Sequence, residues 1–211
     1  IRRGALYLYR DPSLFEAGVQ KMKLLADHGQ KQEVLDAAGV ARLEPAFEPV
    51  KARIAGAIRD VGDSSGDSRI FTEALARVCR EKFGATFETG VRVGALRAER
   101  NRVRAVLTDH GERSADLYVL ALGVDAPIVA RTLGIRIAVY PAKGYSSTFP
   151  IKAGGLVPSV PGVDEQWLVG WSRLGDRLRL TSTAEFAGYD RTWTPRDFGN
   201  IMRFARDIFP D

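Results

Sequence analysis

The stretch FTEALARVCREKFGATFETGVRVGAL, residues 71–96, and its continuation RNRVRAVLTDHGERSADLYVLALG, residues 100–123, decide the fold class. Residues 71–83 repeat apolar side chains at helical spacing and are followed by Gly84, so they predict an amphipathic helix. One face of this helix carries Phe71, Leu75, Val78 and Cys79. The helix therefore has an apolar side that requires a partner.

Strand patterns follow this helix. Residues 85–96 are β-forming, and residues 100–123 predict a hairpin that turns at Asp109-His110-Gly111. The run LYVLAL, residues 117–122, is nearly all apolar, which is typical of a strand buried on both faces. A second helix is expected over residues 127–134. This order indicates part of an α/β layer.

Both flanks are richer in strand patterns. Ser13 with Glu16 makes a capping box for a helix over residues 14–29, and Thr194 with Pro195 starts the last helix. Short helical and strand segments lie between these ends, at 4–10, 32–36, 37–45, 53–60, 139–149, 166–173 and 177–186. The expected fold class is mixed α+β and α/β. It combines a mainly antiparallel sheet flanked by helices, built from 1–59 and 136–211, with an α/β piece over 60–135.

Composition excludes several classes of protein. With 45% hydrophobic and 27% charged residues, the chain is globular, and no apolar run approaches the ~20 residues of a membrane span. No basic-then-apolar leader opens it, and we expect both ends to be cut from something longer. The single Cys79 excludes an internal disulfide and fits a reducing, cytoplasmic compartment. Two histidines far apart, His28 and His110, predict no metal site.

The net charge of +5 is carried by 24 Arg and 7 Lys. The arginines are scattered and not interleaved with aromatic side chains, so we expect no nucleic-acid partner. A solvated surface is the main interpretation, and a weak attraction to anionic lipid is the functional alternative.

Motifs of nucleotide binding are absent. No two glycines lie two apart and no Gly-Lys dipeptide occurs, so neither a dinucleotide loop nor a Walker loop is present. Gly62-Asp63-Ser64-Ser65-Gly66 matches the G-x-S-x-G elbow of serine hydrolases, with Ser64 as nucleophile. Our main interpretation is a polar loop that caps the next helix through Asp67 or Ser68, and the hydrolase is a remote alternative.

Two further patterns have structural interpretations. The carboxylate pairs Glu44/Glu48 and Asp60/Asp63 have nothing to organise them, and we interpret them as solvated loop charges. Three aromatic residues are interpreted as core or sheet-edge side chains: Trp167, Trp171 and Trp193.

The order of several segments resembles the D-amino-acid oxidase superfamily of FAD-dependent oxidoreductases, and within it the bacterial D-amino-acid dehydrogenase (small-subunit) family. The most specific are KGYS at 143–146 and AEFAGYD at 184–190. The others are GALYLYR at 4–10, RLEPAF at 42–47, DSSGDSRIFTEALARV at 63–78, VYPAKGYSSTFPI at 139–151 and ARDIFP at 205–210. The N-terminal GxGxxG unit and the C-terminal portion of the family are missing, so the resemblance implies an interior fragment.

The resemblance implies candidate cofactor residues. By position, the Val91 backbone starts the strand beside the adenine of FAD. Ala121, Leu122 and Gly123 match the small-residue turn near the cofactor. Gly123 also has a plain explanation, because a glycine ends a strand and permits a tight turn.

Candidate substrate residues follow from the same resemblance. Lys143, Gly144 and Tyr145 lie on the strand that faces the flavin in related enzymes. Alternation places Lys143 and Tyr145 on one face, which is expected to line the substrate pocket. An ordinary sheet position remains the alternative for both. Glu185 and Tyr189 are further candidates, and no catalytic residue is assigned.

The resemblance therefore implies FAD-dependent oxidative deamination of D-amino acids to 2-oxo acids by hydride transfer to flavin. It also implies an electron acceptor such as a membrane quinone, and a cytoplasmic protein with a peripheral position at the inner membrane as the alternative. Residues 1–59 and 136–211 become the substrate-binding domain, and 60–135 a partial Rossmann-like FAD-binding domain. We expect the fragment alone to be inactive. Three alternatives stay open: action on glycine, sarcosine or glycerol 3-phosphate, a non-enzymatic substrate-domain module, and a serine hydrolase.

Overall fold

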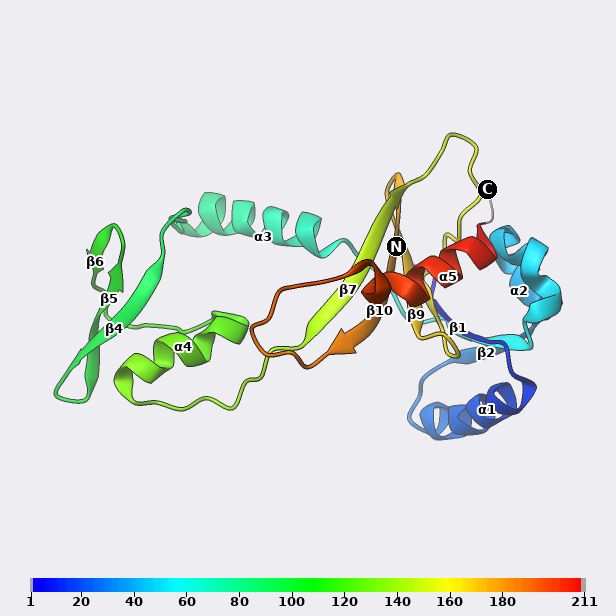
Figure 1. Cartoon of the computed structure of the whole chain (residues 1–211), viewed down its shortest axis with the longest axis horizontal. Coiled ribbons are helices and arrows are strands. Elements are labelled where there is room, and N and C mark those ends of the chain that lie inside the picture. Colours follow the sequence, from blue (N-terminus) through cyan, green and yellow to red (C-terminus); the bar gives the residue numbers. More distant parts are fainter. Residues whose placement is uncertain (1, 210–211) are drawn as a thin grey trace. The chain divides into compact units, whose positions relative to one another are not determined.

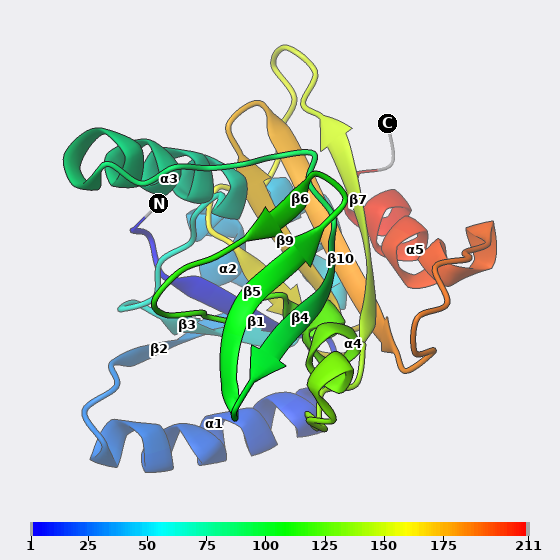
Figure 2. The ribbon, with the colours of Figure 1, turned by 90° about the vertical axis from the view of Figure 1, so that its left-hand side faces the viewer.

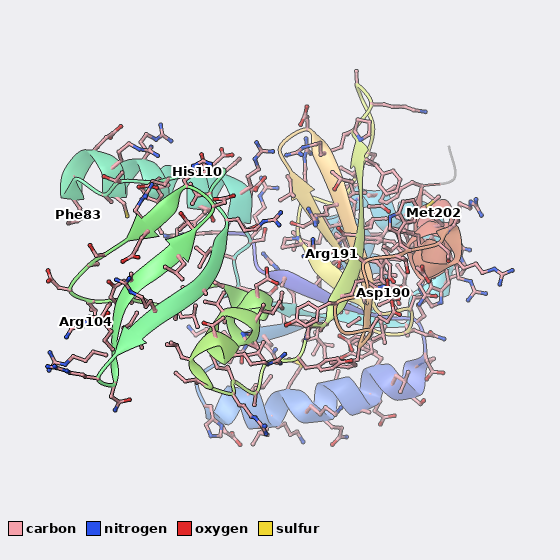
Figure 3. The ribbon with its side chains drawn as sticks, turned by 60° about the vertical axis from the view of Figure 1, so that its left-hand side comes forward. Phe83, Arg104, His110, Asp190, Arg191 and Met202 are labelled. Carbon is pink, nitrogen blue, oxygen red and sulfur yellow. The ribbon has the colours of Figure 1, made fainter. Side chains whose placement is uncertain are left out.

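The computed structural model describes residues 2–209, and these divide into two compact units (Figure 1). The sheet unit comprises Ile1–Phe71, Gly144–Glu185 and Arg191–Asp211, and the hairpin unit comprises Thr72–Lys143 and Phe186–Asp190. Figure 3 marks Asp190 and Arg191, the neighbours at one of these boundaries. The domain roles assigned from the sequence stay a prediction.

The sheet unit is built on seven strands in the order β2-β3-β1-β8-β9-β10-β7. The strand β1 pairs antiparallel with β3 and parallel with β8, whereas β2–β3, β8–β9 and β9–β10 are antiparallel. This confirms the predicted mainly antiparallel sheet. The strands are β1 (Ala5–Tyr9), β2 (Gln32–Asp36), β3 (Gly56–Asp60), β7 (Lys143–Pro150), β8 (Gly162–Asp164), β9 (Val169–Leu174) and β10 (Arg177–Glu185).

Helices of the sheet unit pack on this sheet. Figure 2 shows α2 behind the strands and α5 beside β7 and β10. The helix α1 contacts β1, β2 and β3, where the Tyr9 and Phe15 rings lie 5.7 Å apart. The helical elements are α1 (Pro12–Asp27), α2 (Ala37–Leu43), the 3₁₀ helix η1 (Pro45–Arg53), the 3₁₀ helix η4 (Pro195–Phe198) and α5 (Gly199–Ile208).

The start of α1 differs from the prediction. Asp11, not Ser13, is the N-cap, and its Oδ1 accepts hydrogen bonds from the Ser13 and Leu14 amides at 2.8 and 3.1 Å. The Ser13 hydroxyl also donates to Asp11, and this bond is the main cause of a lowered pKa of the Asp11 carboxyl. Pro12 occupies the first turn, where its missing amide costs nothing. The predicted start of the last helix at Thr194 and Pro195 is confirmed, and Asp197 completes a capping box with Thr194.

The core lies between the sheet and the helices α2, η1 and α5. Alternation along β1 directs Leu6 and Leu8 into it. Trp171 stacks on Phe204 with ring centroids 5.6 Å apart, and Phe47 meets its edge at 5.3 Å. The core prediction is therefore confirmed for Trp171, whereas Trp193 is exposed and meets the Phe198 ring edge-on.

Gly162 marks the closest approach of β8 to its neighbours. A Cβ atom there would lie 2.4 Å from the Leu6 carbonyl oxygen and 2.4 Å from Trp171. Because the Leu6 oxygen belongs to the paired strand, it cannot move aside. Gly162→Ala is expected to lower the free energy of unfolding by about 1–3 kcal/mol in denaturant titrations. Gly199→Ala is the control, since nothing lies within 4 Å of a Cβ at that helical position. Equal stabilities for both variants would contradict this packing.

The hairpin unit holds a three-stranded sheet in the order β4-β5-β6, with both pairs antiparallel. Arg100 and Asn101 form the first turn, both with positive φ, and Asp109-His110 form the second, as predicted. Figure 3 labels His110 at this second turn. The elements are α3 (Ser68–Phe83), which crosses the unit boundary, β4 (Val93–Glu99), β5 (Arg102–Thr108), β6 (Gly111–Arg113), the 3₁₀ helices η2 (Gly123–Asp125) and η3 (Arg131–Leu133), and α4 (Ala126–Ala130).

One prediction of burial in the hairpin unit is wrong. Residues 117–122 form no strand, and Leu117 and Val119 are 80% and 81% exposed. The helix α3 forms as predicted, but none of its residues is buried, including those of its apolar face. The physical reason is that a buried strand needs a neighbour on each side and a helix needs a surface to cover. Among residues 2–209, neither is present for these segments.

Candidate functional site

Two of the predicted substrate residues meet in the sheet unit. The Tyr145 hydroxyl donates to Glu185 Oε2 at 2.5 Å, which joins β7 to the end of β10. The Tyr145 ring is buried in the core and meets Phe198 edge-on at 5.5 Å. Lys143 is half-buried at the start of β7 and is the last residue of the hairpin unit before the chain enters the sheet unit. A role for these residues at a substrate stays a prediction.

The remaining candidates lie in the hairpin unit. Tyr189 belongs to this unit, and its hydroxyl donates to the Val124 carbonyl at 2.7 Å, one residue beyond Gly123. Gly123 has φ +54°, in the left-handed region that favours glycine, which supports the tight turn. Ala121 and Leu122 are exposed, and Val91 is half-buried in the loop before β4. Tyr189 thus contacts the segment predicted to approach the cofactor.

These residues do not form a dinucleotide site by themselves. A pyrophosphate needs closely spaced glycines at the start of a helix, and no two glycines lie two apart in this chain. The helix after Gly123, α4, is short, and the segment before it is exposed. The residues of this chain therefore do not by themselves hold the pyrophosphate of FAD. Within residues 2–209, no group of three His, Cys, Asp or Glu residues is placed to hold a metal ion.

The structure gives the G-x-S-x-G loop a capping role. The Asp67 carboxylate accepts from the Arg69 and Ile70 amides at 2.9 and 3.3 Å, so Asp67 caps α3, as the capping interpretation predicted. Ser64 lies in the loop before this cap and is exposed. His110 belongs to the other unit.

Two carboxylates interpreted as solvated are buried. Glu44 is 2% exposed, and it accepts from Ser159 N, Ser159 Oγ and Val160 N at 2.9, 2.7 and 2.6 Å. Asp60 is equally buried and accepts from the Gly62 amide and the Gln30 side chain. The interpretation is wrong for both because each carboxylate satisfies donors from a distant segment or an adjoining loop. Glu48 and Asp63 are exposed, as expected.

A feature missed from the sequence is the second face of the sheet. The helix α1 contacts it at β2, β3 and β1, and where β1 meets β8, β9 and β10 it carries a hollow of about 350 Å³. The lining of the hollow is mainly apolar, and its polar residues are Tyr7, Asp63, Ser64, Ser65, Ser172, Arg179 and Thr181. The alternating pattern RLRLTSTAE of β10 was the available signal, since its exposed residues share this face.

The hollow has a defined electrostatic character. Burial, and then the negative charge of Asp63, raise the pKa of the Tyr7 phenol, so its hydroxyl stays protonated at neutral pH and can donate a hydrogen bond. The Arg179 guanidinium donates to Ser146 Oγ at 2.7 Å. The hollow therefore combines one cation, one anion and several hydroxyl groups.

Two solved structures share the fold of this chain. Glycine oxidase from Geobacillus kaustophilus superposes with a TM-score of 0.84 at 20% identity, over 100% of this chain and 55% of that protein. L-proline dehydrogenase from P. horikoshii superposes with a TM-score of 0.80 at 18% identity, over 100% and 56%. At these identities the likeness shows the fold alone.

The chain belongs to the FAD dependent oxidoreductase family, whose model matches residues 1–211. It is 41% identical over 209 residues to D-amino acid dehydrogenase 2 of Mesorhizobium japonicum. This match covers 99% of this chain and 50% of that protein. For D-amino acid dehydrogenase of Chromohalobacter salexigens the identity is 37% over 210 residues, covering 100% and 50%. The chain thus spans about half the length of the curated relatives it matches. These matches confirm the family resemblance and the fragment interpretation.

Proposed function

We propose that the complete protein containing these residues is an FAD-dependent dehydrogenase that converts D-amino acids to 2-oxo acids. The observation that carries this proposal is the 41% identity to a D-amino acid dehydrogenase over 99% of the chain. Flavin chemistry of this kind needs the protein to orient the substrate, and it requires neither a metal nor a Ser-His-Asp triad. The acidic, basic and hydroxyl groups of the hollow suit a charged amino acid.

Glycine, sarcosine and glycerol 3-phosphate form the second set of candidate substrates. A likeness in fold to glycine oxidase and L-proline dehydrogenase supports keeping amines other than D-amino acids in any screen. The much higher identity to D-amino acid dehydrogenases favours the first proposal.

Anaerobic mixing of the purified complete protein with candidate substrates tests the function. Bleaching of the flavin absorbance is expected with D-alanine and other D-amino acids, and not with the L-enantiomers. Bleaching by glycine, sarcosine or glycerol 3-phosphate without bleaching by D-amino acids would overturn the proposal. The 211-residue chain alone is expected to purify without flavin, because it lacks the glycine loop that holds a pyrophosphate.

We further propose that the electrons pass to a membrane quinone from a protein on the cytoplasmic side of the inner membrane. The net charge of +5 supports attraction to anionic lipid. Within residues 2–209, no helix combines the length and apolar character that spanning a membrane demands. Reoxidation of the reduced complete protein by a soluble quinone analogue, compared with dioxygen, identifies the acceptor, and cell fractionation tests the location.

A further inference from the structure

Strand register brings the polar groups of the hollow together. The pairs Tyr7↔Val163, Val163↔Gly170 and Gly170↔Thr181 run in one row across β1, β8, β9 and β10. Two residues along the strands from the pair Gly170↔Thr181, Arg179 lies opposite Ser172. Because side chains two residues apart point to the same face, Arg179, Thr181 and Ser172 share the face that carries Tyr7.

Arg179 differs from its neighbour on the same strand face. Arg177 lies 3.7 Å from the Asp67 carboxylate, which offsets part of its charge. Among residues 2–209, the Arg179 guanidinium has one hydrogen-bond partner, the neutral Ser146 hydroxyl, and no carboxylate at ion-pair distance. A guanidinium has five N–H donors in a planar fork, so Arg179 keeps donors for a ligand carboxylate.

Asp63 supplies the opposite charge. In the described part of the chain, its backbone carbonyl accepts from the Gly4 amide, while its carboxylate forms no ion pair. It lines the same hollow as Arg179, yet the two side chains do not pair with each other. Opposite charges held in one hollow and left unpaired are complementary to a ligand that carries both charges.

The centre of the hollow carries neither a large nor a charged side chain. Gly170 contributes no side chain to it, and a Cβ there would already lie 3.1 Å from Thr181 Cγ2. The protonated Tyr7 hydroxyl adds a donor without adding negative charge. A hollow of about 350 Å³ is at the lower end of the range for small-molecule sites, which suits a compact ligand.

We propose that this hollow binds the zwitterion of a free α-amino acid, with Arg179 binding the carboxylate and Asp63 facing the ammonium group. The proposal rests on the proposed function for its ligand class and deepens it by naming recognition residues within this chain. Binding here needs no flavin, so the isolated 211-residue chain can be tested.

Titration of the chain with D-alanine, D-alaninamide and D-lactate, followed by NMR, isolates each charge. D-alanine is expected to bind weakly but saturably. D-alaninamide, which lacks the carboxylate, is expected to bind about tenfold to a hundredfold more weakly, and Arg179→Gln is expected to lose the same factor for D-alanine. D-lactate, which lacks the ammonium group, is expected to bind the unaltered chain more weakly than D-alanine does. The Asp63→Asn variant is likewise expected to bind D-alanine more weakly than the unaltered chain does. In Arg179→Gln, alanine and its amide should bind equally weakly.

Arg173→Gln is the matched control. Arg173 is an exposed arginine on β9 whose guanidinium donates to the Gly175 carbonyl at 3.1 Å, and it does not line the hollow. Its D-alanine affinity should equal that of the unaltered chain. Equal binding of acid and amide, an unchanged Arg179→Gln variant, or no saturable D-alanine binding would each overturn the hollow as a zwitterion site. None of these outcomes bears on flavin bleaching in the complete protein, which tests the proposed function separately.

Discussion

Glu44→Ala is expected to lower the free energy of unfolding of the sheet unit by about 3–5 kcal/mol. Three donors converge on this carboxylate: the Ser159 and Val160 amides and the Ser159 hydroxyl. Alanine removes the acceptor and leaves the Val160 amide and its neighbours buried without a partner. The cost of an unsatisfied buried donor is about 1–3 kcal/mol, and a small cavity adds to it.

Denaturant unfolding followed by tryptophan fluorescence measures this change in the stability of the sheet unit. Trp167, Trp171 and Trp193 all belong to the sheet unit, so the signal reports that unit even where the hairpin unit unfolds separately. The stability of Glu44→Gln should lie between those of the unaltered chain and Glu44→Ala. Its amide oxygen still accepts a hydrogen bond, while its NH₂ group faces donors. Glu48→Ala is the control, expected to change stability by less than about 1 kcal/mol. A Glu44→Ala variant as stable as Glu48→Ala would contradict the bonding described.

Glu44 and Glu48 also show what the sequence could and could not predict. They stand in one short segment, RLEPAFEP, with similar neighbours, and only one is buried. The difference comes from residues 159 and 160, more than a hundred positions along the chain, and local pattern contains no information about such a partner. Helix and strand positions depend on nearby periodicity, which is why most of those were predicted within a few residues.

Glu44 was predicted to be exposed and is buried, whereas the segment 117–122 was predicted to be buried and is exposed. Its apolar run is the correct composition for a strand buried on both faces, and the inference of burial assumed that neighbouring strands were present. The described residues do not provide them, and the curated relatives are about twice as long as this chain. Sequence pattern predicts what a segment requires, whereas burial depends on whether its partners are in the same chain.

The candidate site was harder to predict than the fold for a related reason. Alternation along β10 places Arg179 and Thr181 on one face, and that much is local. Their meeting with Tyr7 and Asp63 depends on the parallel pairing of β1 with β8, which are far apart in the sequence. A one-residue change in that register would move the face away, so the hollow becomes visible only in the folded sheet.

Arg10→Met is expected to lower the free energy of unfolding of the sheet unit by about 3–5 kcal/mol, because it leaves the buried Asp164 carboxylate without its cation and leaves Asp207 with Arg53 alone. Arg10 Nε lies 2.6 Å from Asp164 Oδ2, and Nη1 lies 2.8 Å from Asp207 Oδ2. Arg10 is only 8% exposed, Asp164 is fully buried, and the guanidinium also lies 4.1 Å from the centre of the Trp167 ring. Methionine fills much of the same volume, so the loss measures charge more than packing.

A double variant separates the buried charge from any loss of packing. Asn in place of Asp164 removes one negative charge, while its side-chain oxygen can still accept from the Gln166 and Trp167 amides, which now donate to Oδ1 at 3.1 and 2.8 Å. Arg10→Met with Asp164→Asn should therefore be at least about 1 kcal/mol more stable than the sum of the single changes predicts. Lys51→Met is the exposed control, since its pair with Glu48 is solvated. Strictly additive losses would mean that Arg10 acts through packing against Trp167 and not by neutralising the carboxylates.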